Sequence, residues 1–124
     1  MDALKISHTE DTPQVNFDPA NTVYEITGKA LPEDAVEFFG PIHEWIESFL
    51  ETKPGDFHLT INLTYLNSSA TRYIFNMLCL LEDAYEEGEK TSLTWKYEKD
   101  DEVMEMKGED LEEMLDFPIK LVTY

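Results

Sequence analysis

Four side chains that can form hydrogen bonds lie close together at Asn67, Ser68, Ser69 and Thr71. Asparagine and serine are favoured at helix starts, because their side-chain oxygens accept hydrogen bonds from the free N–H groups of the first turn. A hydroxyl held there is exposed at the positive end of the helix dipole. An added phosphate would be tolerated at this position and could be recognised by a partner. Taken alone, this local pattern favours plain helix capping over regulation.

The residues on either side of this cluster of polar side chains predict a strand followed directly by a helix. The run FHLTINLTY alternates, with Phe57, Leu59, Ile61, Leu63 and Tyr65 on one face. That period of two is typical of a half-buried strand. The helix predicted over residues 68–87 is apolar nearly all round, so we expect it to be buried on more than one side or to form part of an interface.

Arg72 is the only arginine of the chain and lies in the first turn of this predicted helix. A cation is unfavourable at a helix N-terminus, so we expect a compensating anion. The planar guanidinium could bind a nearby carboxylate, or a phosphate on Ser68 or a neighbouring hydroxyl. An ordinary salt bridge is the favoured interpretation.

The remaining elements predict an α/β fold. We expect short strands near residues 4–6, 15–17 and 22–27, the last closed by Gly28, and later strands at 92–97 and 118–124. Helices are predicted at 32–52, with a kink or break at Gly40-Pro41, and at 103–115, as one helix or two hinged at Gly108. Strands alternating with helices indicate a single domain over 1–124 with a mixed, mainly parallel sheet of about five strands and helices mostly on one face. Residues 1–12 are expected to be poorly ordered or an edge strand.

Composition excludes several classes of function. Against 9 basic residues there are 27 acidic ones, so binding to nucleic acid or to anionic membranes is not expected. Cys79 is the only cysteine, and neither a signal peptide nor a membrane-spanning run is recognisable, which predicts a cytoplasmic protein. His8, His43 and His58 are isolated from one another, and HExxH, CxxC, GxSxG and glycine-rich phosphate-loop motifs are absent. We therefore expect no metal, no cofactor and no catalytic residue.

Four segments together resemble the SiaC family of bacterial regulatory phosphoproteins. They are YLNSSATR, the alternating strand before it, the EFFGPIHEWIESFL helix and the SLTWKY strand. The resemblance implies a STAS-like domain, similar to anti-sigma factor antagonists, with a phosphorylatable hydroxyl at a helix start. It also implies a Ser/Thr protein kinase that adds the phosphate and a PP2C-type phosphatase that removes it. The unphosphorylated form is expected to activate a diguanylate cyclase in cyclic di-GMP and biofilm signalling.

Carried onto this chain, the resemblance places the phosphoacceptor at Ser68, where some relatives have threonine. Ser69 and Thr71 are the runners-up. The expected partner-binding residues are Tyr65, Leu66, Asn67, Ser69 and Arg72. We therefore expect a phospho-switch protein that is not an enzyme.

Two alternatives remain. One is a small-ligand binding module with a pocket at the strand ends near Thr64–Ser69. The other is a hydrolase or transferase that uses Ser69 with His58. Those two residues are eleven positions apart along a strand and its turn. At about 3.3 Å per strand residue, they are well outside proton-transfer distance.

Overall fold

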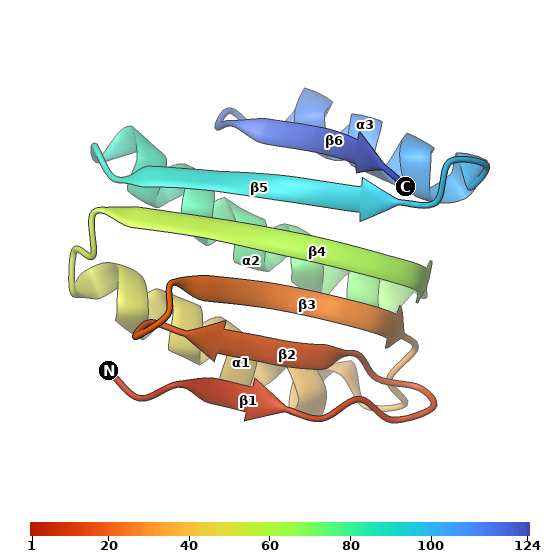
Figure 1. Cartoon of the computed structure of the whole chain (residues 1–124), viewed down its shortest axis with the longest axis horizontal. Coiled ribbons are helices and arrows are strands. Elements are labelled where there is room, and N and C mark those ends of the chain that lie inside the picture. Colours follow the sequence, from red (N-terminus) through yellow and green to blue (C-terminus); the bar gives the residue numbers. More distant parts are fainter.

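The computed structural model describes residues 1–124, which form one six-stranded sheet and three helices (Figure 1). In chain order the elements are β1 (Leu4–Ile6), β2 (Gln14–Asp18), β3 (Val23–Ala30), α1 (Ala35–Glu51), β4 (Asp56–Leu66), α2 (Ser68–Glu86), β5 (Lys90–Tyr97), α3 (Glu102–Met114) and β6 (Ile119–Thr123). The strands also follow chain order across the sheet; β1, β2 and β3 are antiparallel, whereas β3 to β6 are parallel. The predicted mixed sheet is confirmed, with six strands instead of about five.

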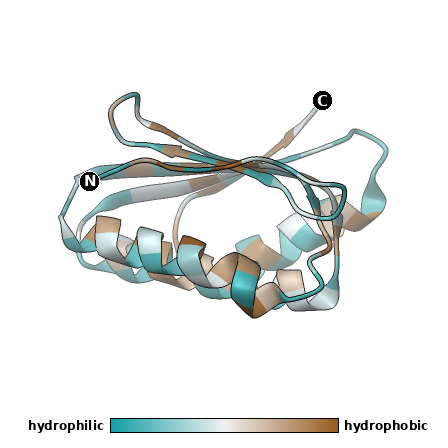
Figure 2. Cartoon of the chain, turned by 90° about the horizontal axis from the view of Figure 1, so that it is seen from below, coloured by the Kyte–Doolittle hydropathy of each residue, from teal (hydrophilic) through white to brown (hydrophobic).

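All three helices cover the same face of the sheet (Figure 2). Each helix joins two parallel neighbours, and each connection moves one strand further in the same direction. Connections of this kind are almost always right-handed, so successive steps in one direction place every helix on one side. The opposite face has no helix over it, and polar side chains such as Thr60, Asn62 and Thr94 lie there only partly exposed.

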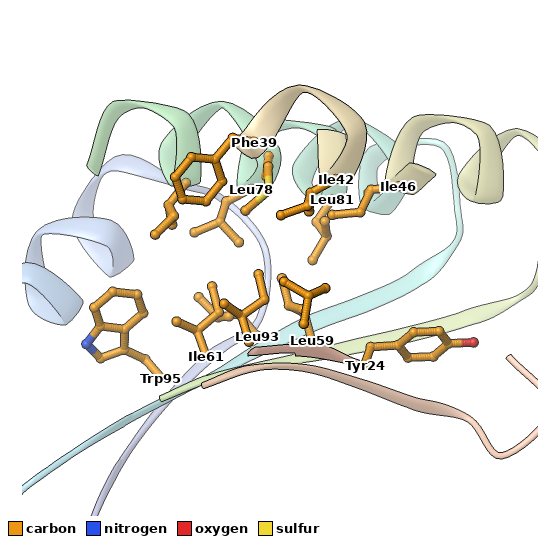
Figure 3. Close-up of a cluster of buried hydrophobic side chains, with 14 of the residues drawn as sticks. Tyr24, Phe39, Ile42, Ile46, Leu59, Ile61, Leu78, Leu81, Leu93 and Trp95 are labelled. Carbon is orange, nitrogen blue, oxygen red and sulfur yellow. The ribbon is translucent and has the colours of Figure 1, made fainter. Parts of the chain in front are cut away.

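The hydrophobic core lies between the helices and the sheet (Figure 3). In β4, Phe57, Leu59, Ile61 and Leu63 are each at most 1% exposed, so the predicted alternation is confirmed as far as Leu63. The helices contribute Phe39, Ile42, Ile46, Leu78 and Leu81 to the same cluster. Burying each large apolar side chain stabilises the fold by about 1.5–3 kcal/mol. This packing fixes the register of β4 and therefore the position of the turn that follows it.

The second helix, α2, lies in the middle of the helix layer, between α1 and α3 (Figure 1). One side of α2 packs on the sheet through Ile74, Met77 and Leu81. Another side meets α1, where the rings of Phe39 and Tyr73 stack with centroids 5.9 Å apart. Burial on more than one side was expected from the sequence, and this arrangement confirms it.

Three local predictions are corrected or resolved by the structure. A single α1 helix continues through Gly40 and Pro41, so no break occurs there. Gly28 does not end the third strand: it lies inside β3 with φ +127°, at a shift in the pairing register with β4. Gly108 is not a hinge, because α3 is one helix across it.

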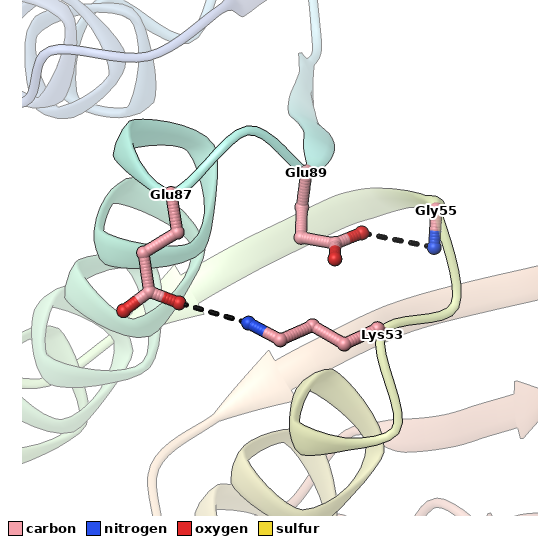
Figure 4. Close-up of polar contacts among 4 residues, drawn as sticks. All are labelled: Lys53, Gly55, Glu87 and Glu89. Atoms are coloured by element: carbon pink, nitrogen blue, oxygen red, sulfur yellow. Dashed lines mark hydrogen bonds and ion pairs between the residues drawn. The ribbon is translucent and has the colours of Figure 1, made fainter.

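The two loops at the N-terminal ends of β4 and β5 are tied together by polar contacts (Figure 4). The Lys53 ammonium lies 3.1 Å from a Glu87 carboxylate oxygen, and the Gly55 N–H donates to Glu89 over 2.9 Å. Lys53 and Glu87 are both well exposed, so this ion pair contributes at most about 1 kcal/mol. These contacts lie at the opposite end of β4 from the hydroxyl-rich turn.

The N-terminal strand β1 forms one edge of the sheet, as Leu4 and Ile6 suggested. The chain before it is held by the Trp45 indole N–H, which donates to the Asp2 carbonyl over 2.9 Å. The helices α1, α2 and α3 all lack the combination of length and hydrophobicity that a membrane-spanning helix requires.

Candidate functional site

The turn between β4 and α2 is held in place from both sides. Asn67 has extended backbone dihedrals and caps α2, and its Oδ1 accepts from the Ala70 N–H over 2.8 Å. The Asn67 N–H in turn donates to the Ala30 carbonyl at the end of β3, over 3.1 Å. The first residues of α2 are therefore fixed relative to the sheet.

The three hydroxyls that follow Asn67 differ in their environments. The Ser69 hydroxyl donates to Asn67 Oδ1 over 3.1 Å, so it belongs to the cap. The Thr71 hydroxyl is half-buried and donates to the Asn67 carbonyl over 2.9 Å. Ser68 is exposed, and its hydroxyl forms no hydrogen bond within the protein. Of the three candidate phosphoacceptors, Ser68 is therefore the one that is both exposed and unengaged.

The start of α2 also differs electrostatically from the other helix starts. The first turn of α1 contains Glu37, and that of α3 contains Glu102 and Glu105, whereas the first turn of α2 contains no acidic residue. The positive end of the α2 dipole therefore has no negative side chain next to it, although the chain carries 27 acidic residues.

Arg72 does not form the salt bridge that the sequence favoured. The only ion pairs are Lys5–Asp18 and Lys53–Glu87, and the exposed Arg72 guanidinium has no hydrogen-bonded side-chain partner. Ser68 and Arg72 are four residues apart on α2, so they lie next to each other on one helix face. The guanidinium is thus free to bind an anion presented there.

Tyr65 and Leu66 bring β4 to this turn, and Tyr65 departs from the predicted apolar face. Leu63 pairs with Gly28 but Tyr65 pairs with Lys29, so one extra residue of β4 is accommodated at this point. Tyr65 is consequently 58% exposed instead of buried, and the Lys29 ammonium lies 5.6 Å from its ring centroid. Leu66 is half-buried and borders a cleft beside α2.

This cleft includes residues that the sequence did not single out as functional. It has a volume of about 270 Å³ between α2 and α3, and Phe75, Lys107, Leu111 and Met114 line it. Lys107 Nζ lies 3.5 Å from the Thr71 hydroxyl, which connects α3 to the hydroxyl-rich turn. The signal available in the sequence was three methionines, Met104, Met106 and Met114, in an otherwise acidic segment.

Comparison with known proteins gives the family of the chain. Residues 6–124 match the model of the SiaC family regulatory phosphoprotein. The chain belongs to the SiaC family of regulatory phosphoproteins. It is also 31% identical over 121 residues to an uncharacterised protein of Pseudomonas aeruginosa strain UCBPP-PA14, an alignment that covers 98% of this chain and 96% of that protein. The resemblance deduced from YLNSSATR and its companion segments is confirmed.

Solved structures of SiaC proteins have the same fold. SiaC of Pseudomonas aeruginosa superimposes with a TM-score of 0.92 at 30% identity, covering 100% of both chains. A crystal structure of the diguanylate cyclase SiaD in complex with its activator SiaC, from the same organism, contains a chain that matches with a TM-score of 0.93 at 30% identity. That match covers 98% of this chain and 99% of the other.

The alternatives considered for this SiaC-family chain gain no support from the geometry. His58 contacts Ser92 across β4 and β5, far along β4 from Ser69, and no cluster of potential metal ligands exists. The hollow at the strand ends near Thr64 and His8 has no hydrophobic residue in its lining, unlike most small-molecule sites. Burial, with nearby acidic groups adding to it, raises the pKa of the Cys79 thiol, which makes it a poor nucleophile.

Proposed function

We propose that this protein is a phospho-switch that activates a diguanylate cyclase when Ser68 is unmodified. The observation that carries this proposal is the state of the Ser68 hydroxyl, which is exposed and forms no hydrogen bond within the protein at the start of α2 in a SiaC-family fold. The complex of SiaD with its activator SiaC supports a cyclase as the output partner. The chain itself catalyses no reaction in this scheme: a Ser/Thr protein kinase adds the phosphate in the cytoplasm, and a PP2C-type phosphatase removes it.

The free protein can accommodate a phosphate at Ser68. The phosphate adds about −1.5 to −2 charges, which the α2 dipole stabilises because no acidic side chain shares its first turn. Arg72, one helical turn further on, provides a cation on the same face. Phosphorylation therefore leaves the fold intact, and the switch must act at the surface where the partner docks.

The same phosphate opposes docking. Arg72 balances only one of the phosphate's negative charges, so burying the phosphate in a contact surface strips the hydration from the remaining charge, which costs several kcal/mol. A penalty of about 3–4 kcal/mol corresponds to a loss of affinity of several hundred-fold. The proposed docking surface surrounds Ser68 and comprises Tyr65, Leu66, Asn67, Ser69 and Arg72.

Ser68 variants test this proposal, with a SiaD-type diguanylate cyclase as the binding partner. Ser68→Ala should bind the cyclase with the parent's affinity and take up no phosphate, whereas Ser68→Asp should bind weakly. Ser69→Ala serves as the matched control and should still be phosphorylated at Ser68. Calorimetry gives the affinities, and peptide mapping after incubation with the kinase places the phosphate. Parent-like binding by both Ser68 variants, or a phosphate mapped to Ser69 or Thr71, would refute the mechanism.

A further inference from the structure

The cleft between α2 and α3 is formed by two helices that lie apart on the same sheet face. Its floor is the Trp95 ring of β5, and Ile74 and Phe75 of α2 form part of one wall. Leu111 and Met114 of α3 form part of the other. The volume of about 270 Å³ is close to the lower end of the roughly 300–1,000 Å³ range of small-molecule sites. Its size and apolar walls suit one or two large apolar side chains of another protein.

Two cations at the rim give this cleft a charge opposite to that of the molecule. Arg72 and Lys107 both line it, and Asp110 is the only acidic residue that does. The whole chain has only 9 basic residues and a formal net charge of −18, so two cations at one cleft are a marked local excess. Neither takes part in an ion pair within the protein. An arginine fork left free in this way fits a carboxylate.

The cleft continues into the turn that contains Ser68. Thr71 lines the cleft, and its hydroxyl donates to the carbonyl of the capping Asn67. Arg72 at the rim is one helical turn from Ser68 on the same face of α2. A phosphate on Ser68 and a carboxylate in the cleft would therefore compete for the same guanidinium.

We propose that the α2–α3 cleft is the docking groove for the output partner, and that its occupant is a segment with a large apolar side chain beside a carboxylate. The apolar side chain enters the cleft over Trp95, and the carboxylate binds Arg72 at the rim. Phosphorylation of Ser68 releases the partner by drawing Arg72 into an intramolecular ion pair. This inference rests on the proposed function, and it adds the residues that recognise the cyclase.

Two methionines of α3 provide a matched pair of variants. Met106 and Met114 are both 57% exposed, but only Met114 lines the cleft. Met114→Glu and Met106→Glu add the same charge to the same helix at equal exposure. We expect Met114→Glu to weaken binding of the SiaD-type cyclase at least ten-fold and Met106→Glu to change it less than two-fold. Thermal melts of both variants establish that the fold is retained.

Arg72→Gln tests the ionic part of the inference. It should weaken cyclase binding, and it should also shrink the ratio of affinities between the unphosphorylated and phosphorylated forms, because the phosphate can no longer withdraw the guanidinium. A variant that only disturbed the fold would lower both affinities and leave their ratio unchanged.

The outcomes separate this inference from the function on which it rests. If Ser68→Asp loses binding while Met114→Glu and Arg72→Gln bind like the parent, the cleft is not the docking groove and the phospho-switch stands. If Met114→Glu alters only self-association, measured by sedimentation, the occupant is a second copy of this chain and the inference is wrong. A parent protein that does not bind the cyclase overturns both.

Discussion

Substitution of Gly108 by alanine tests how closely α3 approaches the sheet. A Cβ atom at this position would lie 2.6 Å from Trp95 Cδ1 and 2.9 Å from Leu121 Cδ2. Trp95 cannot easily withdraw, because it is 1% exposed and its indole N–H donates to the Met104 carbonyl over 2.9 Å. The missing side chain of Gly108 is therefore what allows α3 to rest on the Trp95 ring.

Two opposing effects set the change in stability expected for Gly108→Ala. Alanine is better than glycine in a helix interior by about 1 kcal/mol. Overpacking a core costs about 1–3 kcal/mol, and weakening the Trp95 hydrogen bond adds about 1 kcal/mol. Gly108→Ala should thus destabilise the protein by about 1–3 kcal/mol. An unfolding entropy of about 2.1 cal/mol/K per residue over 124 residues converts this into a fall in Tm of about 4–12 °C.

Gly40→Ala is the matched control, because Gly40 is the other glycine inside a helix and a Cβ there would have no atom within 4 Å. The following Pro41 disfavours a helical alanine, which offsets most of the propensity gain. This variant should stay within about 0.5 kcal/mol of the parent. Calorimetric melting of both variants decides the matter. If Gly108→Ala melts as high as the parent or Gly40→Ala, the close contact between α3 and Trp95 is wrong.

Two further predictions concern the helix cap and alkaline pH. Asn67→Ala removes the α2 cap and Asp34→Ala removes the α1 cap, so each variant should lose about 1 kcal/mol of stability. Only Asn67→Ala should slow phosphorylation of Ser68 by the kinase. Equal phosphorylation rates in the two variants would contradict a role for the Asn67 cap in presenting that serine. Burial raises the pKa of Tyr24 and Tyr97 above 10.0. Their contribution to stability is therefore complete below about pH 10 and is lost as the pH rises through the folded-state pKa. Urea unfolding near neutral pH and at about pH 11 should show this loss of stability, and Tyr97→Phe should make the loss smaller.

The fold could be predicted from sequence to the extent that it depends on local patterns. Alternation identified β4, and helical spacing identified α1 and α2 within a few residues of their observed bounds. Two predictions made from local patterns, the burial of Tyr65 and the break at Gly40-Pro41, were wrong. Tyr65 left the apolar face because β4 shifts its register against β3 near Gly28, and Pro41 was accommodated inside α1.

Some features of the candidate site could also be predicted from the sequence, and others could not. The capped turn and its hydroxyls were visible in the sequence, and the assignment of Ser68 as phosphoacceptor remains a prediction. The environments of the three hydroxyls were not visible in the sequence, because they depend on the folded turn: Ser69 reaches Asn67 Oδ1, Thr71 reaches the Asn67 carbonyl, and Ser68 reaches neither. The state of Arg72 was predicted wrongly, since a salt bridge depends on whether a carboxylate from another element comes near.

By itself, the sequence determined the order of elements, the capped junction at Asn67, the net negative charge and the family. These properties depend on residues within one or two turns of each other, or on composition, and both can be read along the chain. Only the tertiary structure decided that Phe75, Lys107 and Met114 share a cleft over Trp95 with Arg72 at its rim. That arrangement depends on the order of strands in the sheet and on the contact between Gly108 and Trp95, which brings together residues that no local pattern relates.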